Sequence, residues 1–228
     1  MRIENFDEIP STQDYAKEKR SLREDLIVIA KKQTGGRGTK GRVFSSLEGG
    51  VYLSKLSFYE NFPAKDAFKI MTGAAVAVCE TLRFCGLNPV IKWPNDIFIN
   101  DRKICGILIE QTVSGKNISS SVVGIGLNVW NEIPDELFTI ATTVKKETGK
   151  TFSVEEITNR LIKELSKSRS MQEYLSYLGY MGRQATLILG NESVHATLLD
   201  VDEEGGLHVD IKGERRRFTA AEVSVRGV

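Results

Sequence analysis

Four polar side chains in the middle of the sequence have the types and spacing needed to bind an anionic ligand. They lie in the stretch "VIKWPNDIFINDRKICGILIE" and are Lys92, Asn95, Asp96 and Lys103. Proline fixes its own backbone and restricts the residue before it, so "WPND" should form a rigid turn. The apolar runs on either side of "DRK" predict a β-hairpin that brings Lys103 back beside Asp96. Such a cluster suits a nucleotide with Mg²⁺ on Asp96, and a turn with ordinary surface charges is the alternative.

A second cluster is the stretch "KKQTGGRGTKGR", which sets five cationic side chains among four glycines. Glycines let backbone amides approach an anion closely, and Arg37, Lys40 and Arg42 can neutralise a phosphate or a carboxylate. The stretch therefore predicts a flexible lid that binds anions. It is not a Walker A loop, because Lys40 precedes Gly41 and a strand should follow. A solvated basic loop and a nucleic-acid contact are the alternatives.

Composition limits the classes of protein that fit. The chain has 228 residues and a formal net charge of +1, so its cationic clusters indicate local sites and not a general nucleic-acid binder. Three cysteines, Cys79, Cys85 and Cys105, and two histidines predict neither disulfides nor zinc, and we expect the thiols to be structural. The N-terminus lacks a signal sequence and no apolar stretch could span a membrane, which predicts a soluble cytoplasmic protein.

The elements around these clusters follow from hydrophobic periodicity. "DLIVIAKKQ" and "GGVYLSKLSF" predict strands on either side of the basic loop, and "SSSVVGIGLNV" predicts another buried strand. Ser11 should cap a helix that begins near Thr12, with Asp14 completing a capping box. Apolar residues at three- and four-residue spacing predict a helix over 64–84 that includes Cys79 and Cys85.

The pattern changes near Tyr180. Ser153 and Glu156 form a predicted capping box ahead of a helix over 153–167, and a second helix follows in "MQEYLSYLGY". From Gly182 onward, short strands and glycine turns predict a small barrel. We therefore predict two domains, residues 1–180 and 181–228. "RRR" at 215–217 should decorate a barrel strand or its edge, with a docking patch for a protein partner as the alternative.

Six stretches together resemble biotin protein ligases. They are "STQ" at 11–13, "QTGGRGTKGR" at 33–42, "EGGVYLS" at 48–54, "KWPNDI" at 92–97, "RKICGILIE" at 102–110 and "GIGLNV" at 124–129. The resemblance covers nearly the whole chain. It implies an α+β fold: a catalytic core like that of class II aminoacyl-tRNA synthetases, with a mixed, largely antiparallel sheet, and a small C-terminal SH3-like barrel.

The resemblance also implies an activity, its substrates and its partners. The protein would join biotin to a lysine of a biotin carboxyl carrier protein through biotinyl-5'-AMP, using ATP and Mg²⁺ and releasing pyrophosphate. The first motif begins at Ser11 and leaves no room for the DNA-binding domain of some members, so we expect a monofunctional type without specific DNA binding. A homodimer is compatible with the family.

Residue roles carried over from the family are expectations at this point. The biotin-binding residues would be Ser11, Thr12, Gln33, Gly36, Arg37, Lys103, Gly106 and Gly124. The ATP-binding residues would be Lys40, Arg42, Phe44, Lys92, Asn95, Asp96 and Asn128, with Asp96 also next to the metal. The catalytic residues would be Lys92, Lys103, Arg37 and Arg42, with Lys103 holding the biotin carboxylate.

Two positions depart from the family pattern. Thr39 stands where an arginine is usual, and that arginine helps retain the reactive adenylate, so Thr39 should let the adenylate escape faster. Phe44 replaces the usual tryptophan and keeps an aromatic face for adenine without the indole N–H. The competing interpretations are a lipoate protein ligase and a non-enzymatic RNA-binding module that uses the basic loop and "GERRRF".

Overall fold

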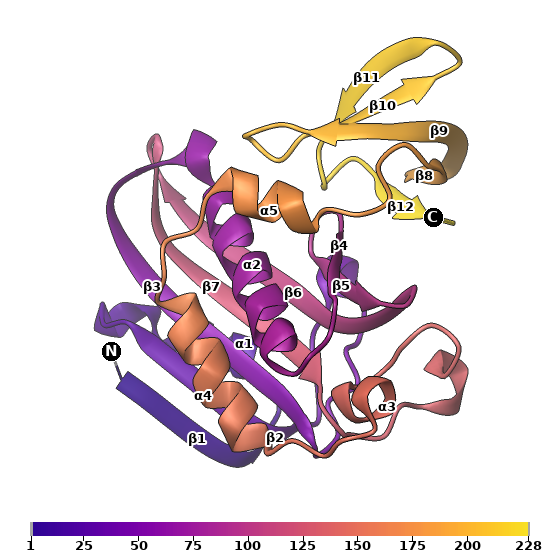
Figure 1. Cartoon of the computed structure of the whole chain (residues 1–228). Helices are drawn as coiled ribbons and strands as arrows, with labels where there is room; N and C mark the ends of the chain where they lie inside the picture. The colour runs from indigo at the N-terminus through magenta and orange to yellow at the C-terminus, as the bar shows by residue number, and fades with distance from the viewer. Residues whose placement is uncertain (1, 228) are drawn as a thin grey trace.

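A computed structural model describes residues 2–227 as a large mixed sheet with helices and a smaller C-terminal sheet (Figure 1). The large sheet has the strand order β1-β2-β3-β7-β6-β5-β4. Its strands are β1 (Arg2–Ile9), β2 (Leu26–Gln33), β3 (Gly50–Pro63), β4 (Val90–Lys92), β5 (Asp96–Ile99), β6 (Arg102–Ser114) and β7 (Asn117–Asn128). Only β1 and β2 are parallel among these pairs, so the predicted mixed, largely antiparallel sheet is confirmed.

Helices cover both faces of the large sheet. The α-helices are α1 (Thr12–Glu18), α2 (Phe68–Phe84), α3 (Val144–Thr148), α4 (Val154–Leu165) and α5 (Met171–Tyr177). On β2, Leu26 and Val28 pack with Ala16 of α1, whereas Ile27 belongs to the core under α2 and α4. Successive strand residues point to opposite faces, and this alternation places α1 on one side and α2, α4 and α5 on the other (Figure 1).

The C-terminal sheet is antiparallel and has the order β11-β10-β9-β8-β12. Its strands are β8 (Gln184–Leu189), β9 (Glu192–Val201), β10 (Leu207–Ile211), β11 (Glu214–Phe218) and β12 (Ser224–Arg226). Its buried residues, such as Leu187 and Val209, belong to the same hydrophobic cluster as α2, so the two sheets pack together. "RRR" lies on the edge strand β11, as predicted.

Local signals explain most element boundaries, with small corrections. Ser11 accepts a hydrogen bond from the Asp14 amide over 3.2 Å, which confirms the cap, but the Asp14 carboxylate pairs with Lys17 and Arg37 instead of completing a box. Ser153 likewise caps α4, which starts at Val154. Cys85 caps the C-terminal end of α2 and is not inside it.

One predicted turn is displaced. We expected the β5–β6 connection at "DRK", but the turn residues are Asn100 (φ 48°) and Asp101 (φ 59°). Both have left-handed backbone, which asparagine and aspartate tolerate and which a two-residue hairpin turn requires. Arg102 and Lys103 therefore already belong to β6, and Lys103 pairs with Phe98.

Candidate functional site

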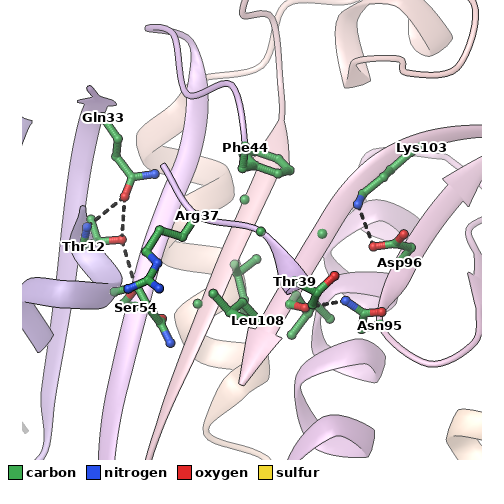
Figure 2. Close-up of a pocket in the computed structure, with 17 residues that line it drawn as sticks. Thr12, Gln33, Arg37, Thr39, Phe44, Ser54, Asn95, Asp96, Lys103 and Leu108 are labelled. Atoms are coloured by element: carbon green, nitrogen blue, oxygen red, sulfur yellow. Dashed lines mark hydrogen bonds and ion pairs between the residues drawn. The ribbon is translucent and has the colours of Figure 1, made fainter. Parts of the chain in front are cut away.

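A narrow polar slot lies between α1 and the strands β3, β6 and β7. Gln33 fixes one wall, because its Oε1 accepts hydrogen bonds from the Thr12 amide at 2.8 Å and the Thr12 hydroxyl at 3.0 Å (Figure 2). Its Nε2 donates to Ser46 Oγ over 2.9 Å. The Thr12 hydroxyl is also 2.9 Å from Ser54 Oγ. Thr12 and Ser54 are buried, so these polar groups hold their orientation before any ligand arrives.

Gln13 provides the back of the slot. Its Nε2 donates to Glu110 Oε2 over 2.8 Å and to the Val122 carbonyl over 3.3 Å. Its Oε1 accepts from Ser54 Oγ over 3.2 Å. Glu110 is held in turn by Lys17, 3.1 Å away. The Gln13 amide is therefore fixed by two side chains and one backbone carbonyl, which belong to three different strands.

Three glycines make room for a ligand against the sheet. Gly106 pairs with Gly126 across β6 and β7, and Gly124 lies two residues earlier on β7. A Cβ at Gly124 would lie 2.5 Å from Gln13 Oε1, and one at Gly126 would lie 2.4 Å from Phe44 Cε1. Any side chain at these two positions would fill the slot.

Phe44 closes the upper end of the slot from the basic loop, which we define as residues 34–47. Its ring lies close to Gly126 and packs edge-on to Tyr52, with ring centroids 6.5 Å apart. Lys103 Nζ lies 6.0 Å from the Phe44 ring centroid. An aromatic ring beside a cation suits a ligand with both a flat group and a negative charge.

Lys103 and Asp96 face each other across the β5–β6 hairpin, as predicted. Lys103 Nζ is 2.7 Å from Asp96 Oδ1 (Figure 2). Asn95 is bound to β6 twice, because its Nδ2 donates to the Ile107 carbonyl over 2.7 Å and its own carbonyl accepts from the Ile107 amide over 3.0 Å. The turn after β4 thus presents a lysine and a carboxylate on a rigid support.

Lys92 is the partly buried cation of this region. Burial lowers its pKa, Asp96 opposes that change, and the nearby positive charges of Lys103 and Arg226 add to it. Lys92 Nζ lies 5.2 Å from the Phe98 ring centroid. Because its charge has no ion-pair partner in the described contacts, an incoming anion would gain a strong interaction there.

The slot opens into a wider groove. The slot has a cavity volume of about 40 Å³ and the groove about 860 Å³. Cationic side chains from both sheets and the basic loop line the groove: Lys40, Arg42, Lys92, Lys103 and Arg226. Residues that line both spaces are Gly38, Thr39, Phe44, Asn95, Asp96, Lys103, Ile107 and Leu108. Lys103 is the cation among these shared residues, so it stands where the slot meets the space lined with positive charge.

The basic loop joins β2 to β3, as predicted, and its cations are tied to different parts of the molecule. Arg37 Nη1 is 2.5 Å from Asp14 Oδ1 on α1. Lys40 Nζ donates to the Val223 carbonyl over 3.2 Å and to Ser224 Oγ over 2.9 Å in the C-terminal sheet. These contacts are exposed or only partly buried, so each contributes little stability and can be exchanged for a ligand.

The structure brings most of the expected site residues together. Those in the slot or groove are Thr12, Gln33, Arg37, Lys40, Arg42, Phe44, Lys92, Asn95, Asp96, Lys103, Gly106, Gly124 and Asn128. Ser11 and Gly36 do not line either space, because Ser11 caps α1 and a Cβ at Gly36 would lie 2.4 Å from the Phe44 carbonyl oxygen. Asn128 is 6% exposed and its Nδ2 donates to the Thr142 carbonyl over 3.1 Å.

Sequence reasoning missed Gln13 and Ser54, two buried polar side chains that line the slot. Gln13 directly follows the "ST" pair, and Ser54 ends the "GGVYLS" stretch opposite Gly124. The signal for Ser54 was its place on a strand that pairs with a glycine strand. Nothing local to Gln13 could reveal that its partner Glu110 is 97 residues away.

Thiols and metal clusters are not part of the site. Cys79, Cys85 and Cys105 are buried and free, and burial raises the pKa of Cys85 to about 11, which keeps this thiol protonated. Within residues 2–227 no three histidine, cysteine, aspartate or glutamate side chains gather as a metal site. No helix in the same range is long and apolar enough to cross a membrane.

The fold and the site define a class of protein: an α+β structure whose polar, glycine-lined slot opens into a groove lined with cations. Comparison with known proteins narrows this class. The chain belongs to the biotin/lipoate A/B protein ligase family, whose model matches residues 6–128. The model of the biotin protein ligase C-terminal domain matches residues 180–226.

Individual relatives agree with this assignment. The bifunctional ligase/repressor BirA of Bacillus subtilis is 30% identical, over 96% of this chain and 72% of that protein. The biotin–[acetyl-CoA-carboxylase] ligase of Paracoccus denitrificans is 28% identical, over 88% of this chain and 90% of that protein. The solved biotin protein ligase of Aquifex aeolicus in complex with biotin and ATP superimposes with a TM-score of 0.79 at 29% identity, covering 99% of this chain and 98% of the other.

Proposed function

We propose that this protein is a biotin protein ligase that uses ATP to attach biotin to a lysine of a biotin carboxyl carrier protein. In the first step, a carboxylate oxygen of biotin attacks the α-phosphorus of ATP, which gives biotinyl-5'-AMP and pyrophosphate. In the second step, the lysine amine attacks the carbonyl carbon of this mixed anhydride, forming an amide and releasing AMP. The homologous ligases that are solved with biotin and ATP, or named for acetyl-CoA carboxylase, support both substrates and this class of acceptor.

The observation that carries the proposal is the position of Lys103 where the slot meets the groove. A carboxylate bound by Lys103 would have its free oxygen directed toward the ATP phosphates. The uncharged end of biotin would lie deeper, among the fixed hydroxyl and amide groups of Thr12, Gln33 and Gln13. Holding two reactants in place in this way lowers the activation free energy by several kcal/mol.

Cations make the first step feasible. Two anions repel each other in water, and cationic side chains that replace the water lower the cost of their approach. We assign Lys92 to the reacting phosphate and carboxylate, and Arg42 and Lys40 to the outer phosphates. Arg37 would close over the biotin with the backbone of the basic loop. The loop then acts as a lid that shields the adenylate from hydrolysis.

Magnesium fits the same groove through Asp96. A Mg²⁺ ion that binds mainly to substrate phosphates needs only one or two protein carboxylates, and Asp96 supplies one. Its present partner is Lys103, 2.7 Å away, which would turn to the biotin carboxylate when the ion binds. When bound, Mg²⁺ would supply charge neutralisation on the phosphates.

The finer classification of the fold is part of this proposal. The largely antiparallel sheet backed by α2 and α4 is compatible with a core like that of class II aminoacyl-tRNA synthetases. The five strands after residue 181 are compatible with an SH3-like barrel, and we place the domain boundary at residues 180–181. The C-terminal family model, which begins at residue 180, supports this boundary.

The test is mass spectrometry of a biotin carrier domain incubated with the full chain, biotin, Mg²⁺ and ATP. A single biotin adduct that requires ATP is the expected result. Parallel reactions contain lipoate in place of biotin, or lack ATP. Modification by lipoate alone would replace the proposal with a lipoate protein ligase, and strongly salt-dependent RNA binding without transfer would favour the RNA-binding interpretation.

A further inference from the structure

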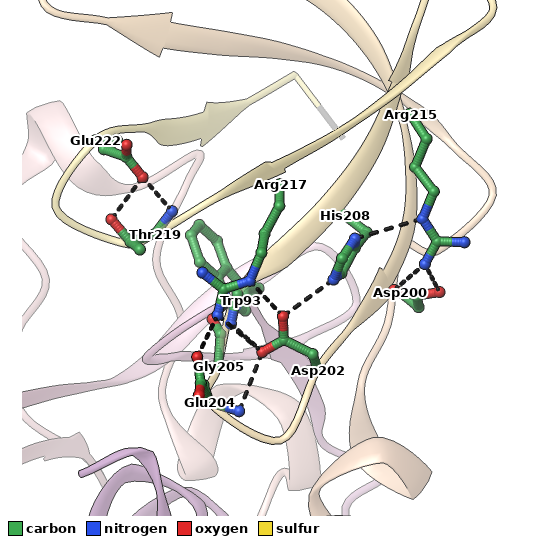
Figure 3. Close-up of polar contacts among 11 residues, drawn as sticks. Trp93, Asp200, Asp202, Glu204, Gly205, His208, Arg215, Arg217, Thr219 and Glu222 are labelled. Carbon is green, nitrogen blue, oxygen red and sulfur yellow. Dashed lines mark hydrogen bonds and ion pairs between the residues drawn. The ribbon is translucent and has the colours of Figure 1, made fainter. Parts of the chain in front are cut away.

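Two turns that are far apart in the sequence meet where the two sheets touch. The 92–96 turn joins β4 to β5 and carries Lys92 and Asp96, and the 202–206 turn joins β9 to β10. The indole N–H of Trp93 donates to the Gly205 carbonyl over 3.0 Å (Figure 3). Trp93 is only 5% exposed. A buried hydrogen bond is costly to leave unmade, so it holds one turn against the other.

Asp202 gives the 202–206 turn its shape. Its Oδ1 accepts hydrogen bonds from the Glu204 amide at 3.0 Å and the Gly206 amide at 2.8 Å (Figure 3). The Gly205 amide donates to the Asp202 carbonyl over 2.9 Å. Gly205 has φ of +83°, which a residue with a side chain adopts only with strain. The carbonyl that binds Trp93 therefore depends on Asp202 for its position.

Two side chains from neighbouring strands hold Asp202 in place. Arg217 Nε is 2.5 Å from Asp202 Oδ2, and His208 Nε2 is 3.0 Å from the same oxygen (Figure 3). Arg217 lowers the pKa of Asp202 well below its usual range, with contributions from the Gly206 amide and His208. The carboxylate is thus ionised at neutral pH and keeps all of these contacts.

A second path links the same two turns through aromatic rings. A Cβ at Gly205 would lie 2.1 Å from Phe68 Cδ2, so the turn is packed against the Phe68 ring. Phe68 packs edge-on to Tyr174, with ring centroids 5.3 Å apart. The Tyr174 hydroxyl donates to the Pro94 carbonyl over 3.0 Å. Three consecutive residues of the 92–96 turn are thereby tied to three elements: the C-terminal sheet, α5 and, through Asn95, β6.

We propose that the 202–206 turn is a positioning element of the active site, and that Asp202 and Trp93 are positioning residues for Lys92 and Asp96. Asp202 lines neither the slot nor the groove. Trp93 lines the groove, but it is 5% exposed and its indole N–H is bound to Gly205, so both residues act by fixing the backbone that carries the two charged groups. The proposal rests on the proposed function. Placement errors near 1 Å can lower a rate by about 100-fold, so a contact of this kind has a kinetic consequence.

Matched variants separate positioning from general stability. Asp202→Asn keeps the shape of the side chain but removes the charge that Arg217 and His208 hold. Trp93→Phe keeps a buried aromatic ring but removes the donor. The control is Asp210→Asn in the next turn of the same sheet, where Asp210 Oδ1 also accepts a backbone amide, that of Gly213, over 3.0 Å. Asp210 lines neither the slot nor the groove.

The kinetic readout is biotin-dependent release of pyrophosphate by the full chain, with kcat and the two KM values measured well below the unfolding temperature. We expect Asp202→Asn and Trp93→Phe to lower kcat about tenfold while KM for biotin changes less than about twofold, because the slot itself is intact. Asp210→Asn should leave both quantities unchanged. A kcat within twofold of the parent in both test variants overturns the proposal, even if their melting temperatures fall.

A second readout does not depend on activity. In a Trp130→Phe background, Trp93 is the remaining tryptophan, and its fluorescence reports on its own surroundings. Asp202→Asn should shift this emission to longer wavelength, because a displaced Gly205 carbonyl lets water reach the indole. Asp210→Asn should not shift it. If the parent protein transfers no biotin, the proposed function is wrong. Whatever that result, an unshifted emission in Asp202→Asn would overturn the coupling of the two turns.

Discussion

The polar groups of the slot are buried and bound to one another, whereas those of the basic loop are exposed. In the slot, Thr12, Gln13 and Ser54 are at most 4% exposed and hold one another through hydrogen bonds between different elements. In the loop, the Arg37 side chain is 46% exposed, and its ion pair with Asp14 is one that water or a ligand can replace. The fixed groups can select the shape of a ligand, whereas the exposed charges can exchange their present partners for a ligand.

This comparison also separates two kinds of kinetic effect. A change in the slot should alter ligand affinity directly, because its groups are already oriented. If the basic loop is the lid proposed above, a change in the loop should mainly alter how long the adenylate stays bound, because a lid must open before release. Lys103 stands at the boundary between them, and its removal should have the largest effect on affinity.

We expect Lys103→Ala to weaken biotin binding by ~2 to 5 kcal/mol, since it removes the positive charge opposite the carboxylate and leaves Asp96 unpaired. Isothermal titration calorimetry with biotin measures this directly. Lys116→Ala is the control, because Lys116 is an exposed lysine at the far end of the β6–β7 hairpin. An unchanged biotin affinity in Lys103→Ala would count against its assignment to the carboxylate.

Gly124→Ala should obstruct the slot without changing any charged residue. The new methyl group would lie 2.5 Å from Gln13 Oε1, so the Gln13 amide must move away from Ser54 and the slot narrows. We expect biotin affinity to fall about tenfold, or about 1.4 kcal/mol. Gly73→Ala in α2 is the matched control, because its methyl group meets no atom within 4 Å. That control should bind biotin normally, and its free energy of unfolding should be about 0.5 to 1 kcal/mol higher than that of the parent. Equal affinities in the two variants would contradict this role of Gly124.

The sequence carried more information about the elements than about their contacts. A β-branched run predicted β2, alternation predicted β3 and a buried apolar run predicted β7. The "WPND" turn with its hairpin predicted that Lys103 would lie beside Asp96. These features depend on neighbours within about a dozen residues, where periodicity and turn chemistry are decisive. The β5–β6 turn was displaced because the left-handed preference of Asn100 and Asp101 outweighed the polarity of "DRK".

Contacts between distant segments could not be predicted in this way. Gln13 meets Glu110 only because α1 packs on β2, β3 and β7, within side-chain reach of β6, and Lys40 meets Ser224 across 184 residues. Ser11 is a different case, because the local pattern correctly predicted its cap on α1, and that hydrogen bond uses the hydroxyl that the family resemblance had assigned to biotin. Tertiary packing decides which polar groups face the ligand, and no local signal encodes it.

Thr39→Arg should make the basic loop retain the adenylate for longer. An added guanidinium at this position, which lines both the slot and the groove, would interact with the adenylate phosphate. We expect release of biotinyl-5'-AMP to slow about threefold, the size of effect typical of one exposed charge pair. Release is followed by stopped-flow mixing after single-turnover adenylation. Thr39→Gln, which has a longer but uncharged side chain, is the control, and equal release from all three proteins would sink the hypothesis.

Lys92 and Arg42 allow the smallest effect to be tested, because both are cations of the groove but only Lys92 is substantially buried. Burial lowers the pKa of Lys92, so over the pH range between its folded and unfolded pKa values the unfolded chain binds more protons and stability rises with pH. At neutral pH the buried charge therefore costs stability. Lys92→Met should raise the melting temperature by about 2 °C at pH 7 while abolishing adenylation, and this gain should shrink as the pH approaches 10.5.

Arg42→Met is the control, and it should change the melting temperature by less than about 1 °C at either pH, since it removes an exposed charge. A Lys92→Met protein that is less stable than the parent would show that the Phe98 contact stabilises Lys92 more than burial destabilises it. A gain that does not depend on pH would show that the gain does not come from removing the charge.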